Sequence, residues 1–169
     1  MFDGSKPTAY IETDEPAPLS VYGRTKRDGE LAMRVCRKHL IFRISWVFGA
    51  HGNNFVKTML RPAKDQPDLR AMADQFGAPT SADLIAEATA DVLHQMTQQS
   101  PSDSRWGLHH LAADGETTWH GLASHAIARA RAIALPLQAS PSTIAPVTSA
   151  DYPTPAIRPA NSRLAVSFQ

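Results

Sequence analysis

Tyr22 and Lys26 stand four residues apart, a spacing that puts two side chains on one helix face with Cβ atoms roughly 5–6 Å apart. A free phenol is a poor acid near neutrality, because its unperturbed pKa is about 10. A neighbouring ammonium group stabilises the phenolate and makes proton release easier. Such a pair can donate a proton to a carbonyl oxygen while a hydride adds to the carbonyl carbon. The spacing alone is weak evidence, because many exposed helix faces carry this pair by chance.

A histidine-based metal site is the other chemistry that the residue types suggest. Four histidines follow one another in the second half of the chain: His109, His110, His120 and His125. Their spacing does not fit an H-E-x-x-H helix, and no cysteine accompanies them. We interpret them as core or solvated histidines and predict no metal site.

The Tyr-Lys spacing has meaning only on a helix, and the flanking residues predict one. Ser20 is a suitable N-cap for a helix that runs to about His39, with Leu31 and Val35 on its apolar face. The single cysteine, Cys36, is expected to be a small buried residue on this helix. One cysteine makes no internal disulfide, which is typical of a protein from a reducing cytoplasm.

Residues 39–48 are β-branched, aromatic and mostly apolar on both alternating faces. This pattern predicts a central strand of a parallel sheet that helices cover on both sides. A turn rich in glycine and asparagine then opens a helix over residues 55–64, which Pro62 should end or kink. Lys57 and Arg61 give that helix a basic stripe, interpreted as a solvated face or as an attraction for a diphosphate.

The remainder of the chain continues the alternation of strands and helices. Ser81 is a suitable N-cap for a helix over residues 82–96. The inner face of this helix should carry Leu84, Ile85, Ala88, Val92 and Met96. The other expected elements are a strand at 69–72, a strand at 106–111, an alanine-rich helix ending near 134, and a Pro-rich tail with at most one strand at 143–147.

Alternating helices and strands predict an α/β layer fold. A buried parallel strand such as 39–48 needs parallel neighbours on both edges, and the chain offers too few. We therefore expect residues 1–169 to form a single but partial domain.

Composition restricts the class of protein without naming a function. The apolar fraction of 43% and the charged fraction of 20% are typical of a globular protein. A net charge of +1 gives no electrostatic reason to expect a nucleic-acid partner. The apolar runs are too short to span a membrane, and the first residues lack the apolar core of a signal peptide. We expect a cytoplasmic protein.

An ordered series of motifs surrounds the Tyr-Lys pair, and together they carry a family resemblance. The motifs are Phe2-Asp-Gly-Ser5, Glu12-Thr-Asp-Glu-Pro16, Tyr22-Gly-Arg-Thr-Lys26, Gly29-Glu30, Phe42-Arg-Ile-Ser-Trp-Val-Phe-Gly49, Gly52-Asn-Asn-Phe-Val-Lys-Thr-Met-Leu60, Asp74-Gln-Phe-Gly-Ala-Pro-Thr80 and Arg158-Pro-Ala-Asn-Ser-Arg-Leu164. In this order they closely resemble the C-terminal part of dTDP-4-dehydrorhamnose reductases, which belong to the extended short-chain dehydrogenase/reductase superfamily.

The resemblance implies the C-terminal portion of a Rossmann-type, doubly wound parallel sheet with a small substrate-binding subdomain. It implies NADPH (or NADH) as cofactor of the complete enzyme, and reduction of dTDP-4-dehydro-L-rhamnose to dTDP-L-rhamnose for cell-envelope polysaccharides. Residues 1–50 would carry the catalytic helix and the following strand. Residues 51–169 would form mainly the substrate-binding part with its Pro-rich tail.

The resemblance also implies roles for individual residues. Tyr22 would donate the proton, and Lys26 would activate it and contact the nicotinamide ribose. Trp46 would lie near the sugar, or belong to the core. Asn53 and Asn54 would contact the phosphates or sugar, or cap the helix that follows them.

Two further motifs complete the set of implied substrate contacts. Asp74 and Gln75 would form the wall on the nucleotide side. Arg158 and Ser162 would belong to a C-terminal closing motif, whose role could be structural.

The departures from the family pattern limit what this chain is expected to do alone. It has no G-x-G-x-x-G turn to hold a pyrophosphate at a helix N-terminus, so the cofactor-binding strands of the family are missing. The family's catalytic Ser or Thr would stand upstream of Phe2. We therefore expect no tight NADPH binding and no activity by the isolated chain. A non-catalytic remnant, a regulatory or interaction subunit of the same fold, and a homodimer remain alternatives.

Overall fold

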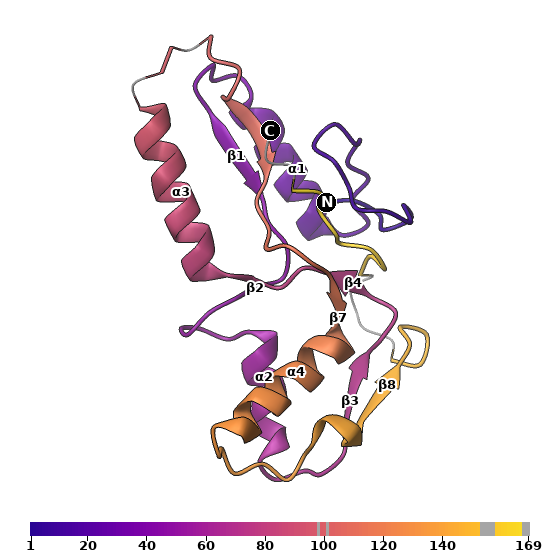
Figure 1. The fold of residues 1–169 in the computed structure, drawn as a ribbon. Coiled ribbons are helices and arrows are strands. Elements are labelled where there is room, and N and C mark those ends of the chain that lie inside the picture. Colours follow the sequence, from indigo (N-terminus) through magenta and orange to yellow (C-terminus); the bar gives the residue numbers. More distant parts are fainter. Residues whose placement is uncertain (98, 101, 153–157, 167–169) are drawn as a thin grey trace.

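The computed structural model describes residues 1–97, 99–100, 102–152 and 158–166. The molecule is elongated and has an upper and a lower part in Figure 1. The upper part holds α1 (Val21–Met33), β1 (Leu40–Arg43), α3 (Ala82–Met96) and β6 (Gly107–His110). The lower part holds α2 (Phe55–Ala63), β3 (Leu69–Met72), α4 (Trp119–Ala132), a short 3₁₀ helix (Pro141–Thr143) and β8 (Ile144–Val147).

The lower part contains the hydrophobic core. Strands β3 and β8 pair in parallel from Leu69↔Ile144 to Met72↔Val147, and helices α2 and α4 pack beside them. The buried cluster consists of Met59, Ala63, Leu69, Ala71, Ala123, Ile127, Ala139 and Ile144. Pro62 lies in the last turn of α2, and the helix ends one residue later, as its missing N–H predicts.

Helix α1 starts where the sequence predicts, but it ends early. The Ser20 hydroxyl accepts a hydrogen bond from the backbone N–H of Gly23 at 3.1 Å, which confirms the N-cap. The predicted end near His39 is wrong, because the backbone N–H of Cys36 bonds the carbonyl of Met33 in a turn. Cys36 is therefore exposed rather than buried on the helix.

The predicted strand over residues 39–48 is interrupted in its middle. Strand β1 ends at Arg43, and β2 (Val47–Phe48) starts after a break at Trp46, which has a positive φ of 43°. Strand β1 pairs in parallel with β6, whereas β2 pairs in parallel with β5 (Thr80–Ser81). One predicted strand thus serves two different pairs, because the chain turns from the upper part to the waist at Trp46.

The waist between the two parts also holds an antiparallel pair, β4 (Phe76–Gly77) with β7 (Thr117–Thr118). The C-terminal segment runs back past this pair to the N-terminal loop. There the Tyr10 N–H donates to the carbonyl of Arg163 at 2.9 Å, and the Ala165 N–H donates to the carbonyl of Tyr10 at 2.7 Å. The two ends of the described chain are therefore held side by side.

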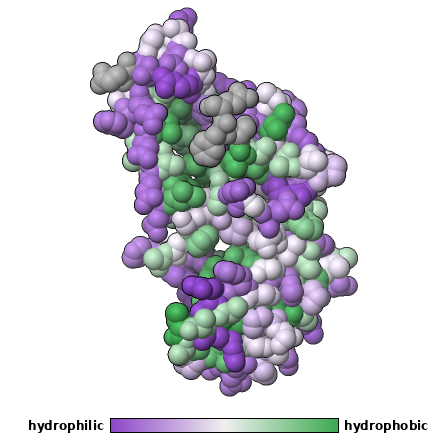
Figure 2. All heavy atoms as spheres, in the orientation of Figure 1, coloured by the Kyte–Doolittle hydropathy of each residue, from purple (hydrophilic) through white to green (hydrophobic). Residues whose placement is uncertain are grey.

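The upper part has too little structure to bury its own apolar residues. Within the described residues β1 pairs with β6 alone, which confirms the prediction of an α/β fold with too few parallel strands. The α3 bounds are as predicted, but only Met96 of its expected inner face is buried, and Leu84 is 40% exposed. Ile85, Ala88 and Val92 are half-buried, so the described residues cover that face only in part. Figure 2 shows apolar residues reaching the surface of the upper part.

No helix among the described residues is long and apolar enough to cross a membrane.

Candidate active site

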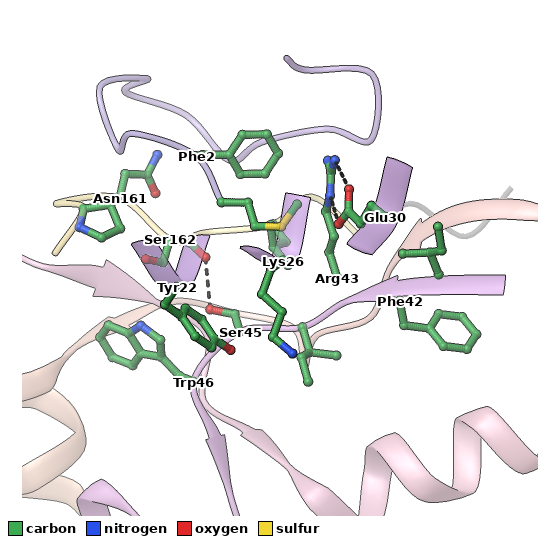
Figure 3. A pocket seen from close by; sticks show the side chains of 15 residues that line it. Phe2, Tyr22, Lys26, Glu30, Phe42, Arg43, Ser45, Trp46, Asn161 and Ser162 are labelled. Atoms are coloured by element: carbon green, nitrogen blue, oxygen red, sulfur yellow. Dashed lines mark hydrogen bonds and ion pairs between the residues drawn. The ribbon is translucent and has the colours of Figure 1, made fainter. Parts of the chain in front are cut away.

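Helix α1 places Tyr22 and Lys26 together at the edge of a cavity. The ammonium nitrogen of Lys26 lies 5.6 Å from the centre of the Tyr22 ring, so the predicted pair forms. Both side chains line a cavity of about 400 Å³ between α1, β1 and the C-terminal segment (Figure 3). Tyr22 is 72% exposed, so its hydroxyl is accessible to a ligand.

A buried ion pair fixes α1 against β1. Glu30 is four residues beyond Lys26 on the same helix face, and its carboxylate accepts two hydrogen bonds from Arg43 at 3.0 and 2.9 Å. Both residues are less than 10% exposed, at 8% and 7%. The Arg43 guanidinium also lies 5.0 Å from the centre of the Phe2 ring. This pair sets where α1, and with it the Tyr-Lys pair, lies over the strand.

Trp46 lines the same cavity from the break after β1. Its ring is stacked on that of Trp119, with ring centres 3.6 Å apart and planes 9° from parallel. Gly77 leaves room for it, because a Cβ there would stand 2.3 Å from the Trp46 ring. The structure thus brings together three of the predicted residues, Tyr22, Lys26 and Trp46.

The C-terminal segment closes one side of the cavity. The Ser45 hydroxyl donates to the carbonyl of Ser162 at 3.0 Å, next to Trp46. Ser162 lines the cavity, whereas Arg158 is exposed and is not among the lining residues. The predicted Arg158 contact is therefore not part of this cavity.

Asn161 is a structural residue of the site that the sequence did not single out. It is 4% exposed, and its amide nitrogen donates to the carbonyls of Lys6 and Thr8, each at 2.7 Å. Its amide oxygen accepts from the backbone N–H of Arg163 at 3.0 Å. The sequence could have indicated Asn161 only through its position inside the closing motif. No residue near it in the sequence indicates that it is buried against the N-terminal loop.

Asn53 and Asn54 serve α2 and do not line the cavity of Tyr22. The Asn54 oxygen accepts from the backbone N–H of Lys57 at 3.1 Å, and its nitrogen donates to the carbonyl of Gly49 at 2.8 Å. Asn53 accepts from the Arg61 guanidinium at 3.0 Å. The capping interpretation of Asn54 accounts for both of its amide atoms.

Asp74 and Gln75 are bonded to other residues of the chain. The Asp74 carboxylate accepts from the backbone N–H of Ser149 at 2.7 Å and from its hydroxyl at 3.0 Å. Gln75 is 4% exposed, donates to the Ser149 hydroxyl at 2.8 Å and accepts from the Trp119 indole at 3.1 Å. Neither residue lines the cavity of Tyr22.

His110 is a buried histidine close to the cavity but outside its lining. Its backbone N–H donates to the Glu12 carboxylate at 3.0 Å. Burial lowers the pKa of His110, and the nearby Glu12 carboxylate opposes that change. Burial acts to raise the pKa of Glu12, but its hydrogen bonds from the backbone N–H groups of His110 and of Glu12 itself, together with the charges of His110 and His109, lower that pKa. No group of three or more His, Cys, Asp or Glu side chains among the described residues could hold a metal ion.

Comparison with known proteins places this geometry in a family. Residues 1–168 match the family model described as the RmlD substrate binding domain. The chain belongs to this family. The resemblance drawn from the motifs is confirmed.

Several similar proteins are dTDP-4-dehydrorhamnose reductases. The reductase of Shigella flexneri is 48% identical over 97% of this chain and 54% of its own length. The reductase of Escherichia coli K12 is 47% identical over the same shares. The chain therefore spans about half the length of the curated relatives it matches.

Solved structures agree with the fold. A dTDP-4-dehydrorhamnose reductase from Bacillus anthracis, in complex with NADP, has a TM-score of 0.82 and 29% identity. The chain covers 53% of that protein, and 98% of the chain is matched. A dTDP-glucose 4,6-dehydratase from the same organism has a TM-score of 0.69 at 13% identity, a likeness of fold alone.

Proposed function

We propose that this chain carries the proton-donating and substrate-binding half of a reductase that converts dTDP-4-dehydro-L-rhamnose to dTDP-L-rhamnose with NADPH (or NADH). The observation that carries the proposal is the convergence of Tyr22, Lys26 and Trp46 on one cavity. Membership of the family and the names of the similar reductases support the choice of reaction.

The bound nicotinamide would supply the hydride to the carbonyl carbon of the sugar. The Tyr22 hydroxyl would then donate its proton to the carbonyl oxygen, which completes the alcohol. Lys26, close to the Tyr22 ring, would stabilise the negative charge left on the phenolate oxygen. Trp46, which lines the same cavity, would pack against the sugar.

The chain fits the nicotinamide end of the cofactor but not its diphosphate. The exposed Tyr22 and Lys26 face leaves space for a ribose and a nicotinamide ring. The four α-helices of the described residues, however, are capped by side chains, those of Ser20, Asn54, Ser81 and Thr118. None is preceded by the Gly-rich turn that holds a pyrophosphate. The diphosphate would need a cradle from the half that the longer relatives possess.

The remaining predicted substrate residues differ in how well they fit this proposal. Within the described part of the chain the Asn53 amide nitrogen makes no hydrogen bond, so it would donate to a phosphate or sugar oxygen at the start of α2. Arg158 is exposed and would reach a ligand only from outside the cavity. Asp74 and Gln75 use their polar atoms on Ser149 and Trp119, so an indirect role suits them better than direct contact.

A second candidate function is an interaction or regulatory subunit, and the β1 edge favours it. Strand β1 pairs on one side within the described residues, and neighbouring apolar side chains such as Ile44 remain 46% exposed. An unpaired edge of this kind is a template for strand addition. In the first function Tyr22 and Lys26 take part in the reduction of a substrate, and in the second they do not.

Titration with NADPH, followed by cofactor fluorescence, tests the proposal. The isolated chain should show no saturable binding, because it lacks the diphosphate cradle. Mixed with the separately produced N-terminal half of the Escherichia coli reductase, it should bind NADPH and reduce dTDP-4-dehydro-L-rhamnose.

The control variants separate catalysis from assembly. Tyr22→Phe should lower the rate of the mixture by roughly 10²–10⁴-fold, the usual contribution of a positioned proton donor. Tyr152→Phe, at an exposed tyrosine that does not line the cavity, should keep the full rate. Tight NADPH binding by the isolated chain, or equal rates of the two variants, would contradict the proposal.

A further inference from the structure

We infer that Gln75 and Trp119 are positioning residues that hold the Trp46 indole in place at the wall of the Tyr22–Lys26 cavity. The inference rests on the proposed function in one respect, which is that the cavity receives the sugar. It assigns Gln75 a task different from direct contact with the nucleotide.

The backbone of Trp46 is held in a conformation that a tryptophan seldom adopts. Its φ of 43° lies in the left-handed region, which is strained for a bulky side chain. Such a conformation persists only where the surroundings enforce it, and these residues cluster at functional sites. The neighbours of Trp46 must therefore enforce this backbone conformation.

Two neighbours fix the Trp46 ring directly. Trp119 is stacked against it at 3.6 Å between ring centres. Gly77 also lies against it, and a Cβ at that position would stand 2.3 Å from the Trp46 ring. The backbone carbonyl of Trp46 also accepts a hydrogen bond from the N–H of Thr80 at 3.2 Å. Trp119 covers one face of the Trp46 ring, so a ligand in the cavity would contact the remaining surface of the indole.

Trp119 is in turn oriented by a directional chain of hydrogen bonds. Its indole N–H, which is a donor only, points to the Gln75 oxygen at 3.1 Å. The Gln75 nitrogen donates to the Ser149 hydroxyl at 2.8 Å, and that hydroxyl donates to Asp74 at 3.0 Å. Because the Ser149 proton is directed at Asp74, its oxygen must accept from Gln75. The amide of Gln75 is thereby oriented with its oxygen toward Trp119.

This chain of contacts spans the waist of the molecule. Gln75 precedes β4, Trp119 begins α4, and Trp46 follows β1, so three separate segments meet at one ring stack. A change at Gln75 would leave the indole N–H of Trp119 unpaired in a half-buried place, which is unfavourable. The stack would then relax and Trp46 would lose its fixed orientation.

Circular dichroism of the isolated chain measures the stack without any ligand. Two stacked indoles whose transition dipoles are rotated relative to each other produce an exciton couplet in the far ultraviolet, and the chain has three tryptophans. The wild type should show the couplet, and Trp106→Phe should keep it, because Trp106 lies outside the stack. Gln75→Met, similar in size but without an acceptor, should abolish it while the cooperative thermal transition remains. Ser149→Ala should weaken it.

Hydrogen exchange of the wild type covers the case in which Gln75→Met does not fold. The indole N–H of Trp119 should exchange slowly with D₂O in a ¹⁵N spectrum, because it is bonded to Gln75. Fast exchange, or a couplet that survives in folded Gln75→Met, would overturn the inference.

The mixture with the cofactor-binding half supplies the functional measurement. Gln75→Met should raise the KM for the sugar nucleotide roughly tenfold, the equivalent of about 1.4 kcal/mol, with a smaller change in kcat. An unchanged KM together with a lost couplet would show that the stack does not position the substrate. If the wild-type mixture is inactive, the proposed function fails, while the couplet still decides whether Gln75 holds the stack.

Discussion

At the scale of single residues, what a reactive side chain does depends on its neighbours more than on its residue type. Tyr22 and Lys26 are exposed and close to each other, as a proton donor and its activating cation require. Gln75, by contrast, uses its amide inside the protein. His110 is the clearest case of an environment acting on a group, because burial lowers its pKa.

The free energy of unfolding should depend on pH through His110. Its pKa in the folded protein lies below the ordinary value of 6.5, so the folded protein binds fewer protons in this window than the unfolded chain. The contribution of His110 to the free energy of unfolding is therefore fully present above about pH 6.5. It decreases as the pH falls toward the lowered pKa, by up to about 1 kcal/mol per pH unit. Urea unfolding between pH 8 and pH 5 measures this slope.

Two variants identify the group responsible for the slope. His110→Asn, which retains a side-chain N–H for the carbonyl of Ala165, should flatten it. His94→Asn, at an exposed position of α3, should not. Glu12 acts in a separate window, because its lowered pKa makes its contribution disappear only below about pH 4.5. An unchanged slope in His110→Asn would show that another group is responsible.

At the scale of elements, α1 depends on few contacts with the rest of the molecule. Val21, Leu31 and Met33 are each at least half exposed, so the apolar face of the helix contributes little packing. The buried pair of Glu30 and Arg43 is the principal side-chain contact between α1 and β1. The position of Tyr22 and Lys26 therefore depends on an ion pair more than on hydrophobic burial.

Glu30→Ala should destabilise the protein by about 3–5 kcal/mol, because it leaves the Arg43 guanidinium buried without its carboxylate. Glu15→Ala is the matched control, since Glu15 pairs with Arg27 at 3.1 Å but its side chain is 85% exposed. Removal of that exposed pair should cost less than about 1 kcal/mol. Chemical denaturation of both variants gives the comparison, and similar losses would show that the buried pair does not anchor α1.

At the scale of the whole molecule, the two parts differ in completeness. The lower part has a closed core around Ile127 and Ile144, with helices packed on its strand pair. The upper part has a two-stranded sheet and exposed apolar residues on both of its helices. A sheet of this size with an accessible edge is prone to association.

Size-exclusion chromatography with light scattering should find the isolated chain larger than a monomer, with a mass that increases with concentration. Ile44→Lys, which puts a charge beside the β1 edge, should shift the mass toward that of the monomer. Ile133→Lys, a change of the same kind at a 75% exposed position after α4, should leave the mass unchanged. A monomer with a sharp thermal transition would show that the upper part is stable without a partner.

The sequence by itself determined those features that depend on neighbours along the chain. Ser20 and Ser81 cap helices at the predicted positions, and residues 69–72 and 82–96 form the predicted strand and helix. The caps and the helix are set by hydrogen bonds within a few residues, and the strand is indicated by the side-chain preferences of its own residues, although its partner β8 is distant in the sequence. The Tyr22–Lys26 pair belongs to this class, because helical geometry alone brings residues four apart together.

Only the tertiary structure decided what lies against each element. The break at Trp46, the burial of Asn161 and the bond from Trp119 to Gln75 join segments 40 or more positions apart, which no local pattern reports. The same reason explains the exposed face of α3. Periodicity indicates which face of a helix is apolar, but burial requires another layer to cover it, and the described residues cover this face only in part.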